Sequence, residues 1–234
     1  MSLFDFLLHH SGLYIPAQWE PSRTWLSVVA FIAMLVATSI HMYGHALMAD
    51  FLGDKTPRTQ GRLSFSPLAH LDPLGLLLLI VTSLIGFPIG WGGRPLRTNP
   101  ENFRCGAKRG MGLVAVAGPI ANLLFACALS PIARWILHGG LGFDDFAIQT
   151  LLVVCLLMII SLSLFAFNFF VPVAPLDGCQ IVASLLPEAI SKPFRTFMSR
   201  YGSYVLIALM YTEVLGKLIA PIIIYLFLWL IGLR

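Results

Sequence analysis

The sequence predicts an all-α polytopic membrane protein with about four spanning helices, and its composition is the first reason. Of its 234 residues, 58% are hydrophobic and only 11% are charged, and the mean hydropathy is +0.84. Soluble domains carry about 25% charged residues. Several apolar segments approach or exceed the roughly 20 residues with which a helix crosses a bilayer. We expect one integral-membrane domain over 1–234, with a core at about 24–187 and a C-terminal helical block at 203–233.

The spanning helices are expected where a long apolar run is bounded by helix-start or helix-stop residues. Their expected positions are about 25–52, 112–137, 147–170 and the last apolar block at 204–233. Glu213 and Lys217 interrupt this last block, and a break near Gly216 would divide it into an interfacial piece and a final span. A short helix ending at about residue 186 follows a proline-flanked turn. Residues 1–20 are expected to form an amphipathic piece at the membrane surface.

The segment near 74–89 is intensely apolar but too short to cross a bilayer. As a helix of about 12 residues it would reach only about 18 Å, and Gly86 and Pro88 are expected to end it. We therefore predict a re-entrant element there. The stretches at 63–66 and 95–98 are candidates for short β segments, and an ordinary juxtamembrane loop is the alternative for both.

The distribution of lysine and arginine predicts which side of the membrane each connection faces. If 74–89 does not cross, eight basic residues within 53–111 lie on the same side as three within 187–202. Positively charged connections mark the cytoplasmic side. The part of the chain that holds His45 and Asp177 is therefore expected toward the cytoplasmic face.

His41 and His45 stand four residues apart near the end of the first predicted span. On a helix this spacing places both imidazoles on one face about 6 Å apart along the axis, which suits two ligands of one Zn²⁺. His41 would lie about 24 Å beyond Trp25, at or within the edge of a hydrocarbon layer of about 30 Å. Ionisable groups at such depth indicate a functional site. Two interfacial histidines at a helix end are the alternative.

A hydrolytic zinc site needs three protein ligands and an open position for water. Asp177 is the best candidate for the third ligand, because it follows an apolar helix and is expected on the same side as His45. An N-cap for a helix at 178–186 explains this aspartate equally well. Cys179 is a weaker rival ligand.

These residues and several further motifs resemble the site-2 protease family of intramembrane zinc metalloproteases. The resemblance rests on the paired histidines, on Ala-Gly-Pro-Ile-Ala-Asn at 117–122, and on Asn168 followed by Pro172, Pro175 and Leu-Asp-Gly at 176–178. Motifs at 61–63, 70–73 and 99–104 are similar to the compact prokaryotic branch, which lacks PDZ and CBS modules. The resemblance covers about 35–187. It implies an integral protein of a prokaryotic cytoplasmic membrane, with the active site toward the cytoplasmic face.

By this resemblance, His41, His45 and Asp177 bind one Zn²⁺, and Asn168 helps to hold substrate near the metal. The two extended segments are implied to clamp an unwound substrate. The implied activity is cleavage of transmembrane segments of regulatory membrane proteins by zinc-activated water. The implied partners are a transmembrane protein substrate and the lipid bilayer, with no nucleic acid, and the sequence leaves the oligomeric state open.

Met42 departs from the family pattern, because the family has its general-base glutamate at this position. A thioether cannot take a proton from zinc-bound water, a role worth about 10²–10⁴-fold in rate. We therefore expect the chain to bind zinc and substrate but to be catalytically inactive. The otherwise intact metal pattern favours an inactivated copy of a working protease, and a natural pseudoprotease that binds membrane proteins without cutting them is the alternative. A metal transporter is a third class, disfavoured because the ionisable residues cluster toward one side.

Overall fold

The computed structural model describes residues 22–70, 77, 81, 96–142, 144–212 and 214–233. Throughout these residues the chain forms helices with irregular connections, and a single β-bridge joins Gly140 and Gly142. The all-α prediction is confirmed for this part of the chain. The predictions for the piece at 1–20, for most of the re-entrant element at 74–89 and for Glu213 lie outside it.

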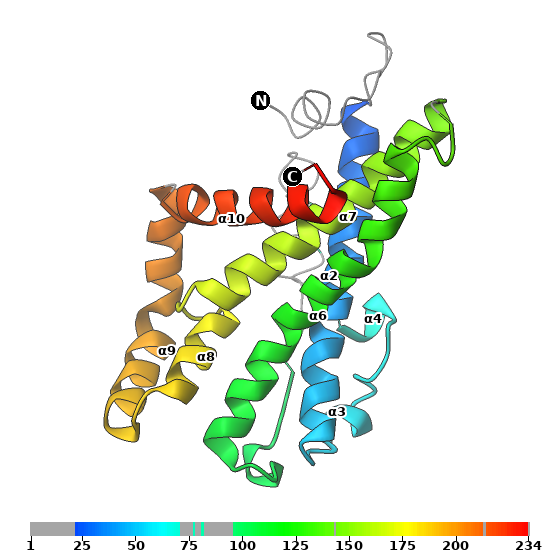
Figure 1. Cartoon of the computed structure of the whole chain (residues 1–234). Coiled ribbons are helices and arrows are strands. Elements are labelled where there is room, and N and C mark those ends of the chain that lie inside the picture. The colour runs from blue at the N-terminus through cyan, green and yellow to red at the C-terminus, as the bar shows by residue number, and fades with distance from the viewer. Residues whose placement is uncertain are drawn as a thin grey trace.

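The described helices carry the labels of Figure 1. In chain order they are α2 (Arg23–Phe51), α3 (Thr56–Thr59), α4 (Pro67–His70), the 3₁₀ turn η1 (Pro100–Asn102), α6 (Ala107–Leu137), α7 (Asp145–Phe170), α8 (Asp177–Leu185), α9 (Glu188–Tyr211) and α10 (Val214–Ile231).

Among the described helices, α2, α6, α7 and α10 are long and apolar enough to cross a membrane, which agrees with the predicted number of spans. The expected bounds of α2 and α7 are correct to within two residues. The second span begins earlier than expected, at Ala107 instead of residue 112, because the helix continues through a basic turn that contains Lys108 and Arg109. Hydropathy marks only the apolar part of such a helix.

Polar side chains set the starts of two of these helices. The Ser22 hydroxyl accepts a hydrogen bond from the Trp25 amide at 3.1 Å, and the Asp144 carboxylate accepts one from Ala147 at 2.9 Å. Such N-caps satisfy amide groups that have no partner within the helix. After α2 the chain turns at Gly53, where a φ of 114° is accessible to glycine at little cost.

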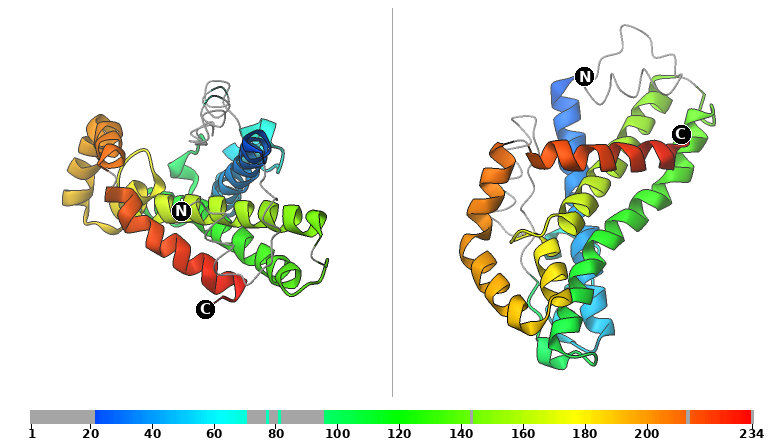
Figure 2. Two further views of the ribbon diagram at one scale, coloured as in Figure 1. Left: turned by 90° about the horizontal axis from the view of Figure 1, so that it is seen from above. Right: turned by 60° about the vertical axis from the view of Figure 1, so that its left-hand side comes forward.

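Helix α6 is central to the bundle, since it packs against α2, α7 and α8 (Figure 1). Helix α10 crosses α7 and α6 instead of running alongside them. Helix α9 packs against α8 and α10 on the side of the molecule away from α2 (Figure 2). The two helices that carry the predicted metal ligands, α2 and α8, therefore meet through α6.

The break in the C-terminal block lies at Thr212 and not near Gly216. Helix α9 runs without interruption from Glu188 to Tyr211, and the amide of Thr212 closes its last turn by donating to the Ala208 carbonyl at 3.1 Å. Gly216 lies within the first turn of α10. A glycine in a helix weakens it without having to end it, so the predicted break was misplaced by a few residues.

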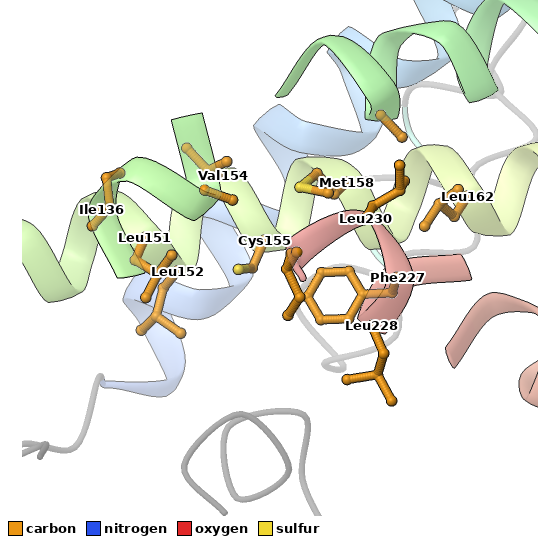
Figure 3. Packing of buried hydrophobic residues seen from close by; sticks show 13 residues of the cluster. Ile136, Leu151, Leu152, Val154, Cys155, Met158, Leu162, Phe227, Leu228 and Leu230 are labelled. Atoms are coloured by element: carbon orange, nitrogen blue, oxygen red, sulfur yellow. The ribbon is translucent and has the colours of Figure 1, made fainter. Parts of the chain in front are cut away.

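The largest buried cluster joins α6, α7 and α10 (Figure 3). Leu162 of α7 is 0% exposed and Phe227 of α10 is 2% exposed. Helix α6 also holds the end of α10, because Arg134 Nε and Ser130 Oγ both donate to the Leu230 carbonyl, at 2.6 and 2.5 Å. Donors at a helix C-terminus satisfy carbonyls that the helix itself leaves without partners.

Neither predicted β segment is confirmed. Within 63–66, the amide of Ser66 donates to the Ser64 hydroxyl at 3.1 Å, and the Ser64 carbonyl accepts from His70 Nε2 at 2.6 Å. Backbone groups that a strand would pair with a neighbour are thus used within the loop itself. Residues 96–98 of the second segment are irregular as well.

A fully buried aspartate, Asp54, fastens the loop after α2 to the segment before α6. Its carboxylate accepts hydrogen bonds from the Thr56 amide and hydroxyl at 3.1 and 2.6 Å, from the Asn99 amide at 2.7 Å and from the Asn102 side chain at 3.1 Å. Burial alone would raise the pKa of Asp54, but the hydrogen bonds from Thr56, Asn99 and Asn102 outweigh it and lower this pKa below its usual value. The ionised carboxylate is therefore part of the folded structure.

Candidate metal centre

Helix α2 presents His41 and His45 on one face, one turn apart. Both side chains are buried, their Nε2 atoms lie 3.0 Å apart, and their ring planes stand at 89° to each other. The rings therefore point to one shared position inside the bundle, as the spacing predicts, and not outward as interfacial histidines would.

Asp177 comes to the same position from the first turn of α8, after the turn that follows α7. Its Oδ2 atom lies 3.0 Å from His41 Nε2 and 3.3 Å from His45 Nε2. The N-cap residue of α8 is Leu176, and no side chain makes a capping hydrogen bond there. The alternative interpretation of Asp177 as an N-cap is therefore wrong, and the carboxylate faces the imidazoles.

The far side of each ring is held by α6. His45 Nδ1 lies 2.7 Å from the Val114 carbonyl, and His41 Nδ1 lies 3.2 Å from Nδ2 of Asn122. A carbonyl can only accept, so His45 carries its proton on Nδ1 and directs the Nε2 lone pair toward Asp177. Fixing the far nitrogen in this way is typical of histidines that bind metals.

Glycines allow α2 and α6 to approach closely enough for these contacts. A β-carbon on Gly118 would lie 2.3 Å from His45 Nε2, and one on Gly44 would lie 2.7 Å from the Ala117 carbonyl oxygen. Real contacts of these kinds are not that short. The Gly-Pro motif of α6 therefore carries a steric function beside the histidine pair.

The three converging atoms fit a metal ion. Two atoms bound to one tetrahedral zinc ion at about 2.0–2.1 Å lie about 3.3 Å apart, and the three separations in this group are 3.0, 3.0 and 3.3 Å. Within the described residues, His41, His45 and Asp177 form a group whose ligand atoms all lie within 4.8 Å of one another. The Oδ2 atom of Asp177 is buried and makes no regular hydrogen bond. Nitrogen and oxygen atoms that converge in this way can share one cation, and two imidazoles with one carboxylate are a zinc ligand set.

The other predicted residues lie outside this group of three. Met42 follows His41 on α2 and is half-buried, and Cys179 is buried in the first turn of α8. The amide of Asn168 donates to the Leu164 carbonyl of its own helix at 2.9 Å. The structure therefore brings Asp177, and not Cys179, to the histidine pair, and the role of Asn168 stays a prediction.

The sequence reasoning missed the supporting residues Val114, Gly118 and Asn122. Gly118 and Asn122 lie in the Ala-Gly-Pro-Ile-Ala-Asn motif that was recognised as a family feature, but nothing in the sequence assigned them to particular histidines. Their spacing of four on α6 is the one signal available, because it matches the spacing of His41 and His45 on α2.

Two curated bacterial proteins are similar to the chain. The first, "Putative zinc metalloprotease YwhC" of Bacillus subtilis, is 31% identical over 201 residues, which cover 82% of this chain and 84% of that protein. The second, "Putative zinc metalloprotease Rip2" of Mycolicibacterium smegmatis, is 33% identical over 147 residues, which cover 58% of this chain and 54% of that protein. No family model and no solved structure matches the chain. Both names describe zinc metalloproteases, in agreement with the ligand set.

Proposed function

Because the chain belongs to the site-2 protease family of intramembrane zinc metalloproteases, we propose that it has the fold of an intramembrane zinc endopeptidase. Its substrates are transmembrane segments of regulatory membrane proteins. The observation that carries the proposal is the convergence of two imidazoles and one carboxylate inside a bundle of apolar helices. In its present sequence the protein binds zinc and substrate but hydrolyses little.

His41, His45 and Asp177 would hold the single Zn²⁺, which would supply an acidified water and a polarised substrate carbonyl. Val114 and Asn122 keep the rings aimed at the ion, and the close packing at Gly118 keeps the site small.

Met42 is the reason for proposing low activity. A general base next to the first histidine accepts a proton from the attacking water and passes it to the leaving amine. The methionine side chain has a similar length to glutamate but no basic atom, so α2 and the ligand geometry are kept while proton transfer is lost. The intact ligand geometry favours an inactivated copy of a working protease.

Substrate holding is proposed for Asn168 and for the segment at 63–66. A helical substrate shields its peptide bonds, so it must become extended before attack, and contacts with an exposed segment beside the metal centre can hold it in that state. Phe65 of this segment is 66% exposed and stacks on Tyr43, one residue from Met42, with ring centroids 4.2 Å apart. The segment therefore lies beside the metal-binding part of α2.

The protein's membrane orientation is also proposed. The basic connections at 53–111 and 187–202 face the cytoplasm of a prokaryotic cell. The metal centre then opens toward the cytoplasmic face of the cytoplasmic membrane.

The second candidate is a natural pseudoprotease that captures membrane proteins without cutting them, and Met42 is the observation in its favour. A metal transporter is a weaker third candidate, since the ligands converge on one position and not on a route. Zinc flux into liposomes that contain the protein would support the transporter.

The deciding experiment restores the base. Met42→Glu, Met42→Gln and the parent are reconstituted in liposomes with a synthetic transmembrane peptide that carries a fluorophore and a quencher on either side of a central Gly-Pro. We expect Met42→Glu to cleave the peptide about 10²–10⁴-fold faster than the parent. Met42→Gln has the same length without a base and should stay at the parent's level.

Zinc analysis of each protein makes the result interpretable. The parent and both Met42 variants should hold about one zinc per chain, and His45→Ala should lose most of it. A zinc-loaded Met42→Glu protein that cuts neither this peptide nor any co-expressed membrane protein, while capture of a partner persists, would favour the pseudoprotease.

A further inference from the structure

The side-chain amide of Asn122 is completely buried between α6 and α2, and only one of its two polar atoms has a hydrogen-bond partner. Its Nδ2 atom lies 3.2 Å from His41 Nδ1, whereas its Oδ1 atom is buried without a hydrogen-bond partner. A buried polar atom without a partner destabilises the folded protein. An unpaired atom on a buried side chain whose other end contacts His41 calls for a functional explanation.

The state of the His41 ring decides which end of the amide can face it. When Nδ2 of Asn122 donates to Nδ1, the neutral ring keeps its proton on Nε2, the atom that lies 3.0 Å from Asp177 Oδ2. Metal binding through Nε2 requires the other tautomer, in which Nδ1 carries the proton and needs an acceptor. A half-turn of the Asn122 amide exchanges Oδ1 and Nδ2 and supplies that acceptor without moving the helix.

We propose that Asn122 is a positioning residue that holds His41 in the tautomer able to bind a metal through Nε2. The inference rests on the zinc centre of the proposed function. An asparagine suits this role because its amide can donate to the metal-free ring and accept from the metal-bound one.

The two metal-binding histidines are thus supported in different ways. His45 Nδ1 donates to a backbone carbonyl, that of Val114, which no substitution removes. His41 depends on a replaceable side chain, and the carbonyl of Gly118 is the other group on α6 that faces its ring. Because this second acceptor remains, loss of Asn122 should weaken metal binding without abolishing it.

The test compares Asn122→Leu, Asn122→Asp and the parent as full-length proteins in detergent. Leucine has a similar volume without polar atoms, and aspartate presents only acceptors. Zn²⁺ affinity is measured by competition with a chromophoric chelator, and the Co²⁺ form is followed by its visible spectrum. We expect Asn122→Leu to bind Zn²⁺ about 10–100-fold more weakly, with a changed Co²⁺ spectrum. Asn122→Asp should bind at least as tightly as the parent.

Ser130→Ala is the matched control, because it removes another buried polar contact of α6, to the Leu230 carbonyl, away from the metal centre. It should lower the thermal stability and leave Zn²⁺ affinity unchanged. Any of three results would overturn the proposal. Asn122→Leu could bind Zn²⁺ as tightly as the parent, or Asn122→Asp could bind it as weakly as Asn122→Leu. The third is a loss of Zn²⁺ affinity in Ser130→Ala equal to that in Asn122→Leu.

Failure of the proposed protease function gives a different result. A parent that binds no Zn²⁺ at all would overturn both proposals. An inert Met42→Glu protein with the expected order of Zn²⁺ affinities would overturn the protease activity and leave the role of Asn122 standing.

Discussion

Replacing Gly118 by alanine tests the contact between α6 and the metal centre. The new β-carbon would lie 2.3 Å from Nε2 and 2.4 Å from Cε1 of His45, whereas atoms in ordinary contact are about 3.5 Å apart. The His45 ring would have to retreat by about 1 Å, and a metal site tolerates errors of only about 0.2 Å in its ligand distances. We expect Gly118→Ala to weaken Zn²⁺ binding by at least about 100-fold.

The stability of the metal-free protein should change much less. Alanine favours a helix over glycine by about 0.5–1 kcal/mol, which partly offsets an overpacking cost of about 1–3 kcal/mol. Gly216→Ala is the matched control, because a β-carbon there meets nothing within 4 Å. Zinc per chain and chelator competition measure the affinity, and thermal unfolding checks the fold. A Gly118→Ala protein with the parent's zinc affinity would refute the reasoning, because the His45 ring could then move without loss of the metal.

Two further predictions concern the scaffold. Asp54→Asn should destabilise the protein by about 2–3 kcal/mol at pH 7, because charge-assisted hydrogen bonds are lost. Folding lowers the pKa of Asp54. The contribution of this carboxylate to stability is therefore complete at a pH above its unfolded pKa of about 3.9, and it is lost as the pH falls through the lower pKa of the folded state. The difference in melting temperature between parent and variant should therefore shrink below about pH 4, and a constant difference down to the most acidic pH would contradict this. Arg134→Met should remove the two hydrogen bonds from Arg134 to the end of α10 and leave the one from Ser130. The expected cost is about 1 kcal/mol, seen as faster amide exchange at 227–231, and Arg134→Lys should lie between Arg134→Met and the parent.

The apolar helices and the histidine pair could be predicted from the sequence because both depend on local spacing. A run of apolar residues marks a span, and two histidines four residues apart must share a helix face. Asp177 was left between two interpretations, since a carboxylate before a short helix caps it in many proteins. Its placement 3.0 Å from His41 Nε2, with Leu176 as the N-cap residue of α8, favours the ligand over the cap.

The predictions that failed depended on partners that a sequence does not show. The stretch at 63–66 has the alternation of a strand, yet a strand forms only where a neighbouring segment offers matching backbone groups. In this protein His70 and Ser64 satisfy the loop locally. In the same way, Asn122 and Gly118 could not be matched to particular histidines until the packing of α6 on α2 was known.

The central position of α6 has a consequence for the order in which the molecule is assembled. The histidine pair is complete as soon as α2 forms, but Asp177 lies 132 residues after His45 and reaches it only once α6 has docked between α2 and α8. With the proposed ligands, a nascent chain that ends before α8 would have two of the three and would not retain the ion at full strength. Metal retention is therefore expected to be a late event in biogenesis, and zinc content would then report how much of a preparation has finished folding.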